Sequence, residues 1–472
     1  METPTPIEAF MRRIANPLVQ DAQIQTSSGQ RWLYALGNLG CAIPYQTVGA
    51  VALFFYVDVL KLPPLWASAV MTAYAIFNAV NNPLMGYLSD RTKSRWGRRI
   101  PFILFGTVPY ALFFAALFLA PFNGADQPVA LLIWFIAALF LFETLATVVQ
   151  TAYYALLPEM FSEYHDRTSV AVRMNIFMTV GLIIGAALPI SLASVLGWPW
   201  MGLLLGLISA AALLFAVRGM FERQSNLSAP EVPWWQSVKA TFYNRSFLTI
   251  VFAQTMRHFA TAVASSGLAF YTKYSLGADP ASSSMILATI FIVATLALYP
   301  WKRFLANRLE ARTTLLIAYA LMGVSTIPLY LAQSLLAALL TAALMGTALA
   351  GLLLMGDVTL SDVIDEDETQ TGQRREGMYF GMSGFVITFA YALSSLVFGW
   401  LSTAYGYDPL ASAQPESVAE GFRIFMSIPP AVGSLLAFAA LWFYPLHGAR
   451  LKQVKALLQA KSASADLAQP QE

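Results

Sequence analysis

Long apolar blocks alternate with short polar segments along most of the chain. A helix that spans a membrane needs about 20 mostly apolar residues, and the apolar blocks are long enough to predict twelve such helices. We expect them at residues 33–60, 66–89, 100–121, 128–157, 168–196, 198–217, 246–275, 282–300, 314–333, 334–360, 378–404 and 420–446. The pattern therefore predicts an all-α membrane protein.

One long polar stretch divides the predicted spans into two groups of six. We expect an N-terminal bundle at 33–217, a cytoplasmic linker at 218–245 and a C-terminal bundle at 246–446. The segments outside the bundles, 1–32 and 447–472, are expected to be cytoplasmic tails. The first of them lacks the apolar core of a cleaved signal peptide.

Composition supports the membrane interpretation and excludes several other classes. Hydrophobic residues make up 57% of the chain and charged residues 11%, whereas soluble domains are roughly a quarter charged. The net charge of +2 gives no reason to expect a nucleic-acid partner, so the expected partners are the lipid bilayer and a small solute. We find no nucleotide-binding P-loop and no nucleophile–base pair or metal triad, so we expect no enzyme, cofactor or metal. A single cysteine, Cys41, excludes an intrachain disulfide.

Basic residues set the expected orientation. Lysine and arginine concentrate in the loops after the even-numbered spans, while the loops after odd-numbered spans hold only Lys61 and, at a span edge, Lys273. Lys and Arg accumulate on the cytoplasmic side of a membrane. Both termini should therefore be cytoplasmic, and we expect a monomer in a bacterial inner membrane.

The loop between the second and third spans combines helix-ending and basic residues. Gly86 allows close backbone approach, and the carboxylate of Asp90 can pair with basic groups at a helix end. The basic residues of this predicted cytoplasmic gate are Arg91, Arg95, Arg98 and Arg99. After the tenth span, Asp362, Asp365 and Arg375 extend the gate, with the acids facing the arginine clusters. A solvated acidic loop does not promise the converging ligands that a metal site needs.

This loop, with its Arg-Trp-Gly-Arg core, resembles the signature of the major facilitator superfamily. Together with Asn82-Pro83 before it, the loop is similar to the glycoside–pentoside–hexuronide:cation symporters, the branch of the melibiose permeases and the lysophospholipid symporters. Segments 55–60, 362–381 and 406–409 are also similar to that family, and the resemblance covers about residues 33 to 446. It implies a major facilitator fold of two six-helix halves that transports a solute by alternating access.

Several positions depart from the family pattern. Where the melibiose permeases bind their cation with two aspartates in span two, this chain has Asn78 and Asn82. Their sugar-contacting aspartates fall at Ala42 and Gln150, and a lysine of span eleven falls at Thr388. Asparagine offers a carbonyl oxygen but no negative charge, so coupling to Na⁺ is disfavoured.

Two charges remain deep in predicted spans. A charge in the hydrocarbon region is costly, so each one is a functional hypothesis. Glu143 and Arg257 lie about 21 Å and about 17 Å from the cytoplasmic ends of their spans, at 1.5 Å per residue. We expect them to face each other across the two halves, to pair in one state of the cycle and to separate in another, with protonation of Glu143 giving a route to H⁺ coupling. A permanent structural ion pair, or a glutamate bound to a neighbouring helix, is the alternative.

Uncharged polar residues suggest a hydrogen-bonding pocket. The three side-chain amides of Asn78, Asn81 and Asn82 are costly to bury unless they form hydrogen bonds. They could line a cavity or form hydrogen bonds between helices, and both interpretations stay open. The pocket candidates are Tyr45, Gln46, Asn78, Asn81, Asn82, Gln150, Tyr153 and Thr388. His258 follows Arg257 by one residue, about 100° around a helix, so we expect it to face elsewhere as a packing residue. Arg173 is either a gate residue, a helix-end residue or a substrate contact.

The neutral pocket favours transport of a sugar or other glycoside. A lysolipid as substrate, uncoupled uniport, and a receptor that transports nothing stay open as alternatives.

Overall fold

The computed structural model is built almost entirely of helices and describes residues 18–19, 27–92, 94, 97–161, 164–223, 244–371 and 375–468. The chain divides into two compact units. Unit 1 comprises Met1–Glu231 with two short later segments, Pro280–Ser284 and Tyr407–Gln414, and unit 2 comprises the remainder.

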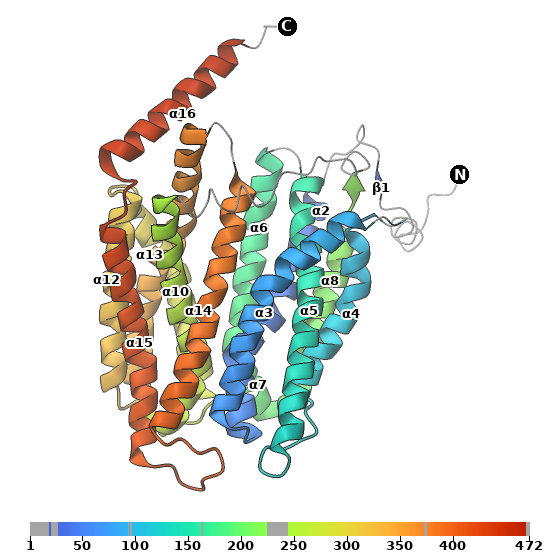
Figure 1. Cartoon of the computed structure of the whole chain (residues 1–472), viewed down its shortest axis with the longest axis vertical. Helices are drawn as coiled ribbons and strands as arrows, with labels where there is room; N and C mark the ends of the chain where they lie inside the picture. Colours follow the sequence, from blue (N-terminus) through green and yellow to red (C-terminus); the bar gives the residue numbers. More distant parts are fainter. Residues whose placement is uncertain are drawn as a thin grey trace. The chain divides into compact units, whose positions relative to one another are not determined.

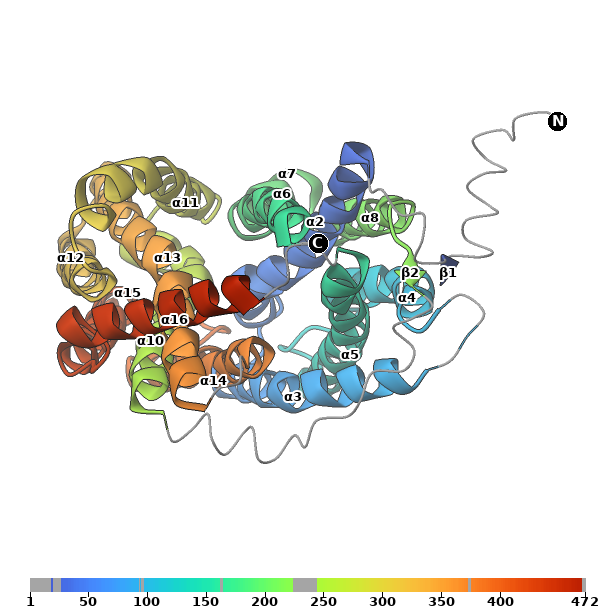
Figure 2. The ribbon, with the colours of Figure 1, turned by 90° about the horizontal axis from the view of Figure 1, so that it is seen from above.

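Unit 1 contains the first group of helices, drawn from blue to green in Figure 1. They are α2 (Ser28–Leu53), α3 (Pro64–Arg91), α4 (Ile100–Leu117), α5 (Pro128–Met160), α6 (Tyr164–Leu182), α7 (Pro189–Leu196) and α8 (Trp198–Val217). The π-helical segment η2 (Phe54–Val59) continues α2, and η3 (Ile183–Ala187) joins α6 to α7. Helix α2 packs against both α6 and α8, as the view along the helices in Figure 2 shows.

Unit 2 holds the second group, drawn from green to red. Its helices are α10 (Arg245–Phe270), α11 (Ser282–Pro300, from Met285 on), α12 (Ala311–Leu331), α13 (Leu335–Thr371), α14 (Glu376–Ala404), α15 (Glu416–Trp442) and α16 (Gly448–Ala468). The π-helical segments η5 (Tyr271–Ser275) and η6 (Trp301–Ala306) continue α10 and α11. Helix α15 packs against both α10 and α12.

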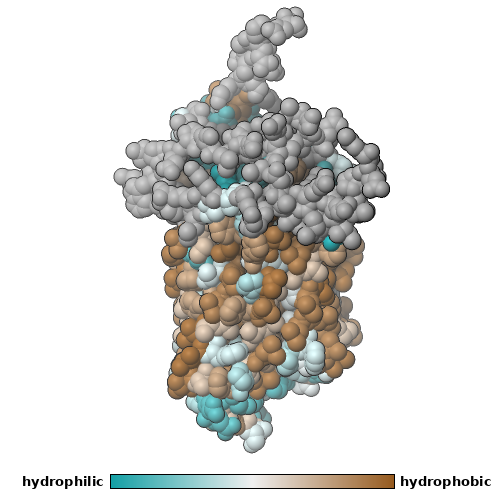
Figure 3. Space-filling view, turned by 90° about the vertical axis from the view of Figure 1, so that its right-hand side faces the viewer, coloured by the Kyte–Doolittle hydropathy of each residue, from teal (hydrophilic) through white to brown (hydrophobic). Residues whose placement is uncertain are grey.

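The predicted all-α membrane fold is confirmed. Ten helical segments of the described part are long and apolar enough to cross a membrane. The second and seventh predicted spans are α3 and α10, whose 28 and 26 residues suffice for a crossing while their polar side chains lower the hydropathy. Figure 3 shows the hydrophobic band on the face it presents, with hydrophilic residues gathered at its lower end.

Small residues allow the helices to approach closely within each unit. A Cβ added at Gly40 of α2 would lie 2.7 Å from the Ser209 carbonyl oxygen of α8, and the Ser209 hydroxyl donates to the Gly40 carbonyl at 2.5 Å. In unit 2, a Cβ at Gly346 of α13 would lie 2.5 Å from the Ile290 carbonyl oxygen of α11. Without a hydrophobic force between helices in lipid, such close packing and interhelical hydrogen bonds hold a bundle together.

Two helix ends differ most from the sequence-based expectation. Helix α2 begins at Ser28 rather than at 33, because Ser27 and Gln30 form a reciprocal capping box. Helix α13 runs to Thr371 rather than to 360. The acidic residues predicted for a loop after the tenth span therefore lie on an extension of this helix beyond the predicted span.

A small sheet joins the two polar segments that flank the helices of unit 1. Strand β1 (Leu18–Val19) pairs in parallel with β2 (Glu222–Arg223), with Leu18 opposite Glu222. Strand β2 follows α8 directly and lies near the start of α4, which brings Glu222 to the site described below.

Candidate functional site

Glu143 lies at the centre of a polar cluster between α5 and α3. Its side chain is 1% exposed, and its Oε1 accepts hydrogen bonds from the amide of Asn78 and from the hydroxyl of Thr147, the latter at 3.2 Å. Thr147 lies one helical turn after Glu143 on the same face of α5. Within the described part of unit 1, Glu143 forms no ion pair. Its carboxyl group is thus held by uncharged donors.

The asparagines of α3 continue this cluster. The Asn82 amide donates to the Asn78 Oδ1 at 2.8 Å and to the Asn78 carbonyl oxygen at 3.0 Å. The two amides therefore share a face, as their spacing predicted. Asn81 is 3% exposed, and its Nδ2 has no hydrogen-bond partner among the described residues. On α5, Gln150 is half-buried.

Tyr153 packs against a second tyrosine, Tyr34 of α2. It is fully buried, its ring stacks on Tyr34 at 4.9 Å, and the two hydroxyls donate to each other's backbone carbonyl oxygens at 2.7 and 2.8 Å. These contacts pack α5 against α2, and the predicted pocket role of Tyr153 stays a prediction. The neighbouring Tyr154 is 42% exposed and donates to Asn38 at 2.8 Å. Tyr45 and Gln46 of α2 are half-buried.

Arg173 is anchored within unit 1. Its Nη1 donates to the Ser169 carbonyl oxygen at 2.8 Å and to the Ser169 hydroxyl, one turn earlier on α6. Its guanidinium lies 5.1 Å from the centre of the Trp32 ring, within the range of a cation–π contact. These contacts fit a positively charged residue that fastens α6 to the start of α2.

The second charged cluster lies on α10 in unit 2. The Arg257 Nη2 lies 2.9 Å from His258 Nε2, and His258 Nδ1 lies 3.4 Å from the Tyr391 hydroxyl of α14. A guanidinium only donates, so Nε2 must accept and the imidazole is neutral with its proton on Nδ1. The structure thus corrects the expectation that His258 faces away from Arg257, because the long arginine side chain folds back onto the ring. Within unit 2, Arg257 forms no ion pair with a described residue.

Other polar groups of α10 and α14 were not singled out by the sequence. Gln254 lies one turn before His258; its amide donates to the Gly356 carbonyl oxygen at 3.0 Å and its Oε1 accepts from Ser383 at 3.3 Å. The four-residue spacing of Gln254 and His258, which places both on one face of a helix, could have indicated this polar group from the sequence. Thr388 is half-buried, and its hydroxyl donates to its own helix at the Gly384 carbonyl oxygen, 2.9 Å away.

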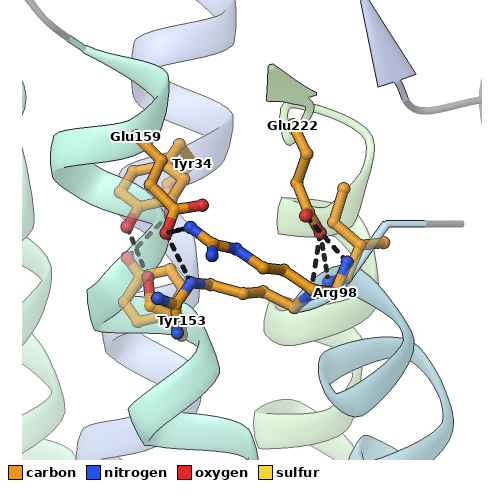
Figure 4. A network of polar contacts seen from close by, with 7 residues as sticks. Tyr34, Arg98, Tyr153, Glu159 and Glu222 are labelled. Atoms are coloured by element: carbon orange, nitrogen blue, oxygen red, sulfur yellow. Dashed lines mark hydrogen bonds and ion pairs between the residues drawn. The ribbon is translucent and has the colours of Figure 1, made fainter. Parts of the chain in front are cut away.

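Arg98 and Arg99 of the predicted gate converge on one carboxylate of unit 1. Arg98 Nη2 and Arg99 Nε lie 2.8 and 2.7 Å from Glu159 Oε1 at the end of α5. Figure 4 shows the Arg98 side chain reaching Glu159, beside the Tyr34–Tyr153 stack. The backbone N–H groups of the same two residues donate to Glu222. Neither acid was predicted from the sequence, although a lone glutamate at the end of a span was a signal for Glu159.

The rest of this loop is only partly described. Gly86, Asp90 and Arg91 lie on the last turns of α3, but their side chains are outside the described part of the chain, as is all of Arg95. Their predicted gate role stays a prediction.

The acidic residues of α13 are paired within unit 2. Asp362 Oδ1 lies 3.1 Å from Lys455 Nζ and Glu366 Oε1 lies 2.5 Å from Arg450 Nη2, both basic groups being on α16. Arg375 forms two hydrogen bonds with Asp367 at 2.5 and 3.0 Å, and this bonding raises the pKa of its guanidinium above the ordinary value. The acids were expected to face the arginine clusters, but the C-terminal helix supplies two of their partners. Asp365 is half-buried on the same extension.

Comparison with known proteins identifies the family. A model described as MFS/sugar transport protein matches residues 33–448. The chain belongs to this family. It is a membrane transporter of the glycoside–pentoside–hexuronide type within the major facilitator superfamily, and its relatives are transporters rather than enzymes.

Two curated relatives indicate how varied this family is. The isoprimeverose transporter of Lactiplantibacillus pentosus is 25% identical, over 97% of this chain and 98% of the relative. The sodium-dependent lysophosphatidylcholine symporter 1 of Xenopus tropicalis is 24% identical, over 92% of each chain.

A solved structure supports the fold of this transporter. The bacterial homolog of the human lysosomal transporter Spinster, in an inward-facing and unoccupied conformation, superimposes with a TM-score of 0.66. It covers 89% of this chain and 97% of its own, at 14% identity. At this identity the likeness concerns the fold alone.

Proposed function

We propose that this chain is a secondary active transporter that moves a neutral sugar or glycoside by alternating access, with H⁺ coupled through Glu143. The observation that carries the proposal is the Glu143 cluster. A buried carboxyl group bonded to Asn78 and Thr147, with no basic partner among the described residues of its unit, is a group that can take up and release a proton.

The same cluster supports a neutral solute. Asn78 and Asn82 replace the carboxylates that would attract Na⁺ in this family, while their amides can donate to and accept from hydroxyl groups. Sugars present many hydroxyl groups and no charge. The relative from Lactiplantibacillus pentosus, named for isoprimeverose, supports a glycoside as the first solute class to test.

The predicted pairing of Glu143 with Arg257 belongs to this proposal. Among the described residues of its own unit, Arg257 has a neutral histidine as its partner and no acid. A guanidinium without an acid gains most from a carboxylate that becomes available during the cycle. In this scheme, protonation of Glu143 releases Arg257. We place the transporter in a bacterial inner membrane with both termini in the cytoplasm, because of the positions of its basic loops.

A lysolipid is the second candidate solute. An apolar groove of about 360 Å³ runs between α3 and α5 in unit 1, from Trp66 and Leu132 to Phe140, one turn from Glu143. Its lining could accommodate a hydrocarbon chain next to the polar cluster. The relative from Xenopus tropicalis, named for lysophosphatidylcholine, makes this a defined alternative.

Uptake into proteoliposomes tests these proposals. We expect a radiolabelled glycoside from a panel of mono- and disaccharides to accumulate under an inward H⁺ gradient, and a lysophosphatidylcholine probe not to. In Glu143→Gln we expect the stimulation by the H⁺ gradient to be lost while solute counterflow remains. Uptake of the glycoside that keeps its pH profile in Glu143→Gln would exclude coupling at this residue. Accumulation of the lysolipid alone would favour the second candidate.

A further inference from the structure

Glu222 is a buried acid that the proposed transport cycle does not use. Its side chain is 2% exposed, although it lies in a polar segment after α8. Its Oε2 accepts from the Arg98 N–H at 2.8 Å, and its Oε1 accepts from the N–H groups of Arg99 and Ile100 at 2.8 and 2.9 Å. All three backbone donors at the start of α4 thus converge on one carboxylate.

The backbone before α4 is shaped to receive this carboxylate. Gly97 is buried and has a φ of +93°, a conformation that side-chain-bearing residues rarely adopt. A Cβ at this position would lie 2.4 Å from Glu222 Oε1. Only glycine leaves room for the carboxylate against the N–H groups. The positive φ and the contact with Glu222 therefore explain why the Arg-Trp-Gly-Arg core has a glycine at this position.

The two residues that Glu222 holds by their backbone are the ones that bind Glu159 by their side chains. Arg98 and Arg99 lie between two carboxylates, with Glu222 at their N–H groups and Glu159 at their guanidinium groups (Figure 4). The side chains of Arg98, Arg99 and Glu159 are 14%, 9% and 11% exposed. Two positive and two negative charges balance in a largely buried place, where an unpaired charge would be costly.

We propose that Glu222 is the positioning residue of this arginine pair. By fixing the first N–H groups of α4, it sets where both arginine side chains leave the backbone and so holds them on Glu159. It thereby ties the polar segment after α8 to the cytoplasmic ends of α4 and α5. Glu222 acts only through Arg98 and Arg99 and makes no contact with Glu159.

Hydrogen exchange of the purified full-length protein can test the proposal at both places, the N–H groups before α4 and the end of α5 that carries Glu159. In Glu222→Gln we expect exchange of the Arg98, Arg99 and Ile100 amides to accelerate at least about tenfold, because an N–H group replaces one acceptor of the carboxylate. We also expect faster exchange in the last turn of α5, at Met160 and Phe161. In Glu159→Gln, only the α5 amides should accelerate. Glu416→Gln, an exposed glutamate in the first turn of α15, is the matched control and should change neither region.

A double-mutant cycle separates positioning from simple capping. If Glu222 acts through the arginine pair, the loss of Tm in the double variant Glu222→Gln/Glu159→Gln is smaller than the sum of the two single losses. Additive losses, with α5 exchange unchanged in Glu222→Gln, would overturn the proposal and leave Glu222 as a cap of α4 only. Unchanged exchange of the amides at residues 98–100 would contradict the hydrogen bonding of these N–H groups to Glu222.

A conservative variant covers the case in which Glu222→Gln does not fold. Glu222→Asp keeps the charge but is one methylene shorter, so it should give intermediate exchange at residues 98–100. If amide exchange in Glu222→Asp equals that of the unmodified protein, the full length of the glutamate side chain is not required to reach these N–H groups. None of these measurements requires a transported solute, so their failure is distinguishable from a failure of the proposed function.

Discussion

At the residue scale, the hydrogen-bond partners of Glu143 determine the free-energy cost of burying its carboxyl group. Asn78 supplies an amide donor to Glu143 and also accepts from Asn82. Removing one partner of a buried hydrogen bond leaves the other unsatisfied, which costs more than the bond itself contributes. Asn78 and Asn82 are thus part of what keeps Glu143 inside the bundle.

Asn78→Ala should therefore lower the stability of the protein by about 1–3 kcal/mol, the cost of leaving a buried acceptor unsatisfied. Thermal unfolding in detergent measures this loss. The loss should shrink in a Glu143→Gln background, because the neutral amide needs less compensation. Asn175→Ala changes an exposed asparagine of α6 and is the matched control. Equal losses for the two alanine variants would show that the Asn78–Glu143 contact does not matter for stability.

Gly97→Ala should destabilise the protein by about 1–3 kcal/mol, because the positive φ is strained for alanine and the new Cβ meets Glu222. Gly49→Ala is the control within the same unit. Gly49 lies inside α2 with no atom within 4 Å of an added Cβ, so alanine there should stabilise by about 0.5–1 kcal/mol. The two Tm shifts should have opposite signs, and shifts of the same sign would contradict this explanation.

Spacing along a helix predicted some side-chain positions and not others. The four-residue spacing of Asn78 and Asn82 placed their amides together, and the structure agrees. Tyr153 and Tyr154 differ by one residue, about 100° around the helix, and this rotation decides which is buried. Glu222 could not be foreseen, since its partners lie more than 120 residues earlier and only tertiary packing brings them together.

At the element scale, α13 is longer than its apolar sequence predicts. Hydropathy marks where a helix leaves the membrane and says nothing about where its backbone stops being helical. Beyond residue 360 the acids Asp362, Glu366 and Asp367 are buried, and each is neutralised by a basic group of unit 2. The acids of α13 and the basic residues of α16 are visible in the sequence, but their pairing depends on where α16 lies.

Arg450→Ala tests whether α16 stabilises this extension. Glu366 has a side-chain exposure of 2% and would lose its basic partner, so we expect a loss of about 1–3 kcal/mol even though Arg450 itself is half-exposed. Lys452→Ala, an exposed lysine on the same helix, should have little effect. Thermal unfolding compares the two, and trypsin cleavage near α13 should accelerate only in Arg450→Ala. Indistinguishable variants would show that the Arg450–Glu366 pair contributes nothing measurable.

At the scale of the whole molecule, the sequence was most informative about fold class and least about chemistry. Apolar length and charge asymmetry follow from the bilayer acting as a solvent, which constrains every span in the same way. The solute and the coupling ion depend on a few side chains, which the general constraint of the bilayer does not determine. Fold and family were therefore predictable, whereas Arg257 bonding to His258 was not.

The orientation in the membrane can be tested with the chain's own single cysteine as background. Cys41 is 2% exposed, so a membrane-impermeant maleimide should leave the unmodified protein unlabelled. Ala125→Cys lies in an exposed turn between α4 and α5, and Ala449→Cys lies on the exposed face of α16. The basic loops predict that α16 lies on the cytoplasmic side, so intact cells should label the first variant and not the second. After permeabilisation both should be labelled. Labelling of Ala449→Cys in intact cells would reverse the orientation, and with it the direction of the H⁺ gradient that the proposed transport requires.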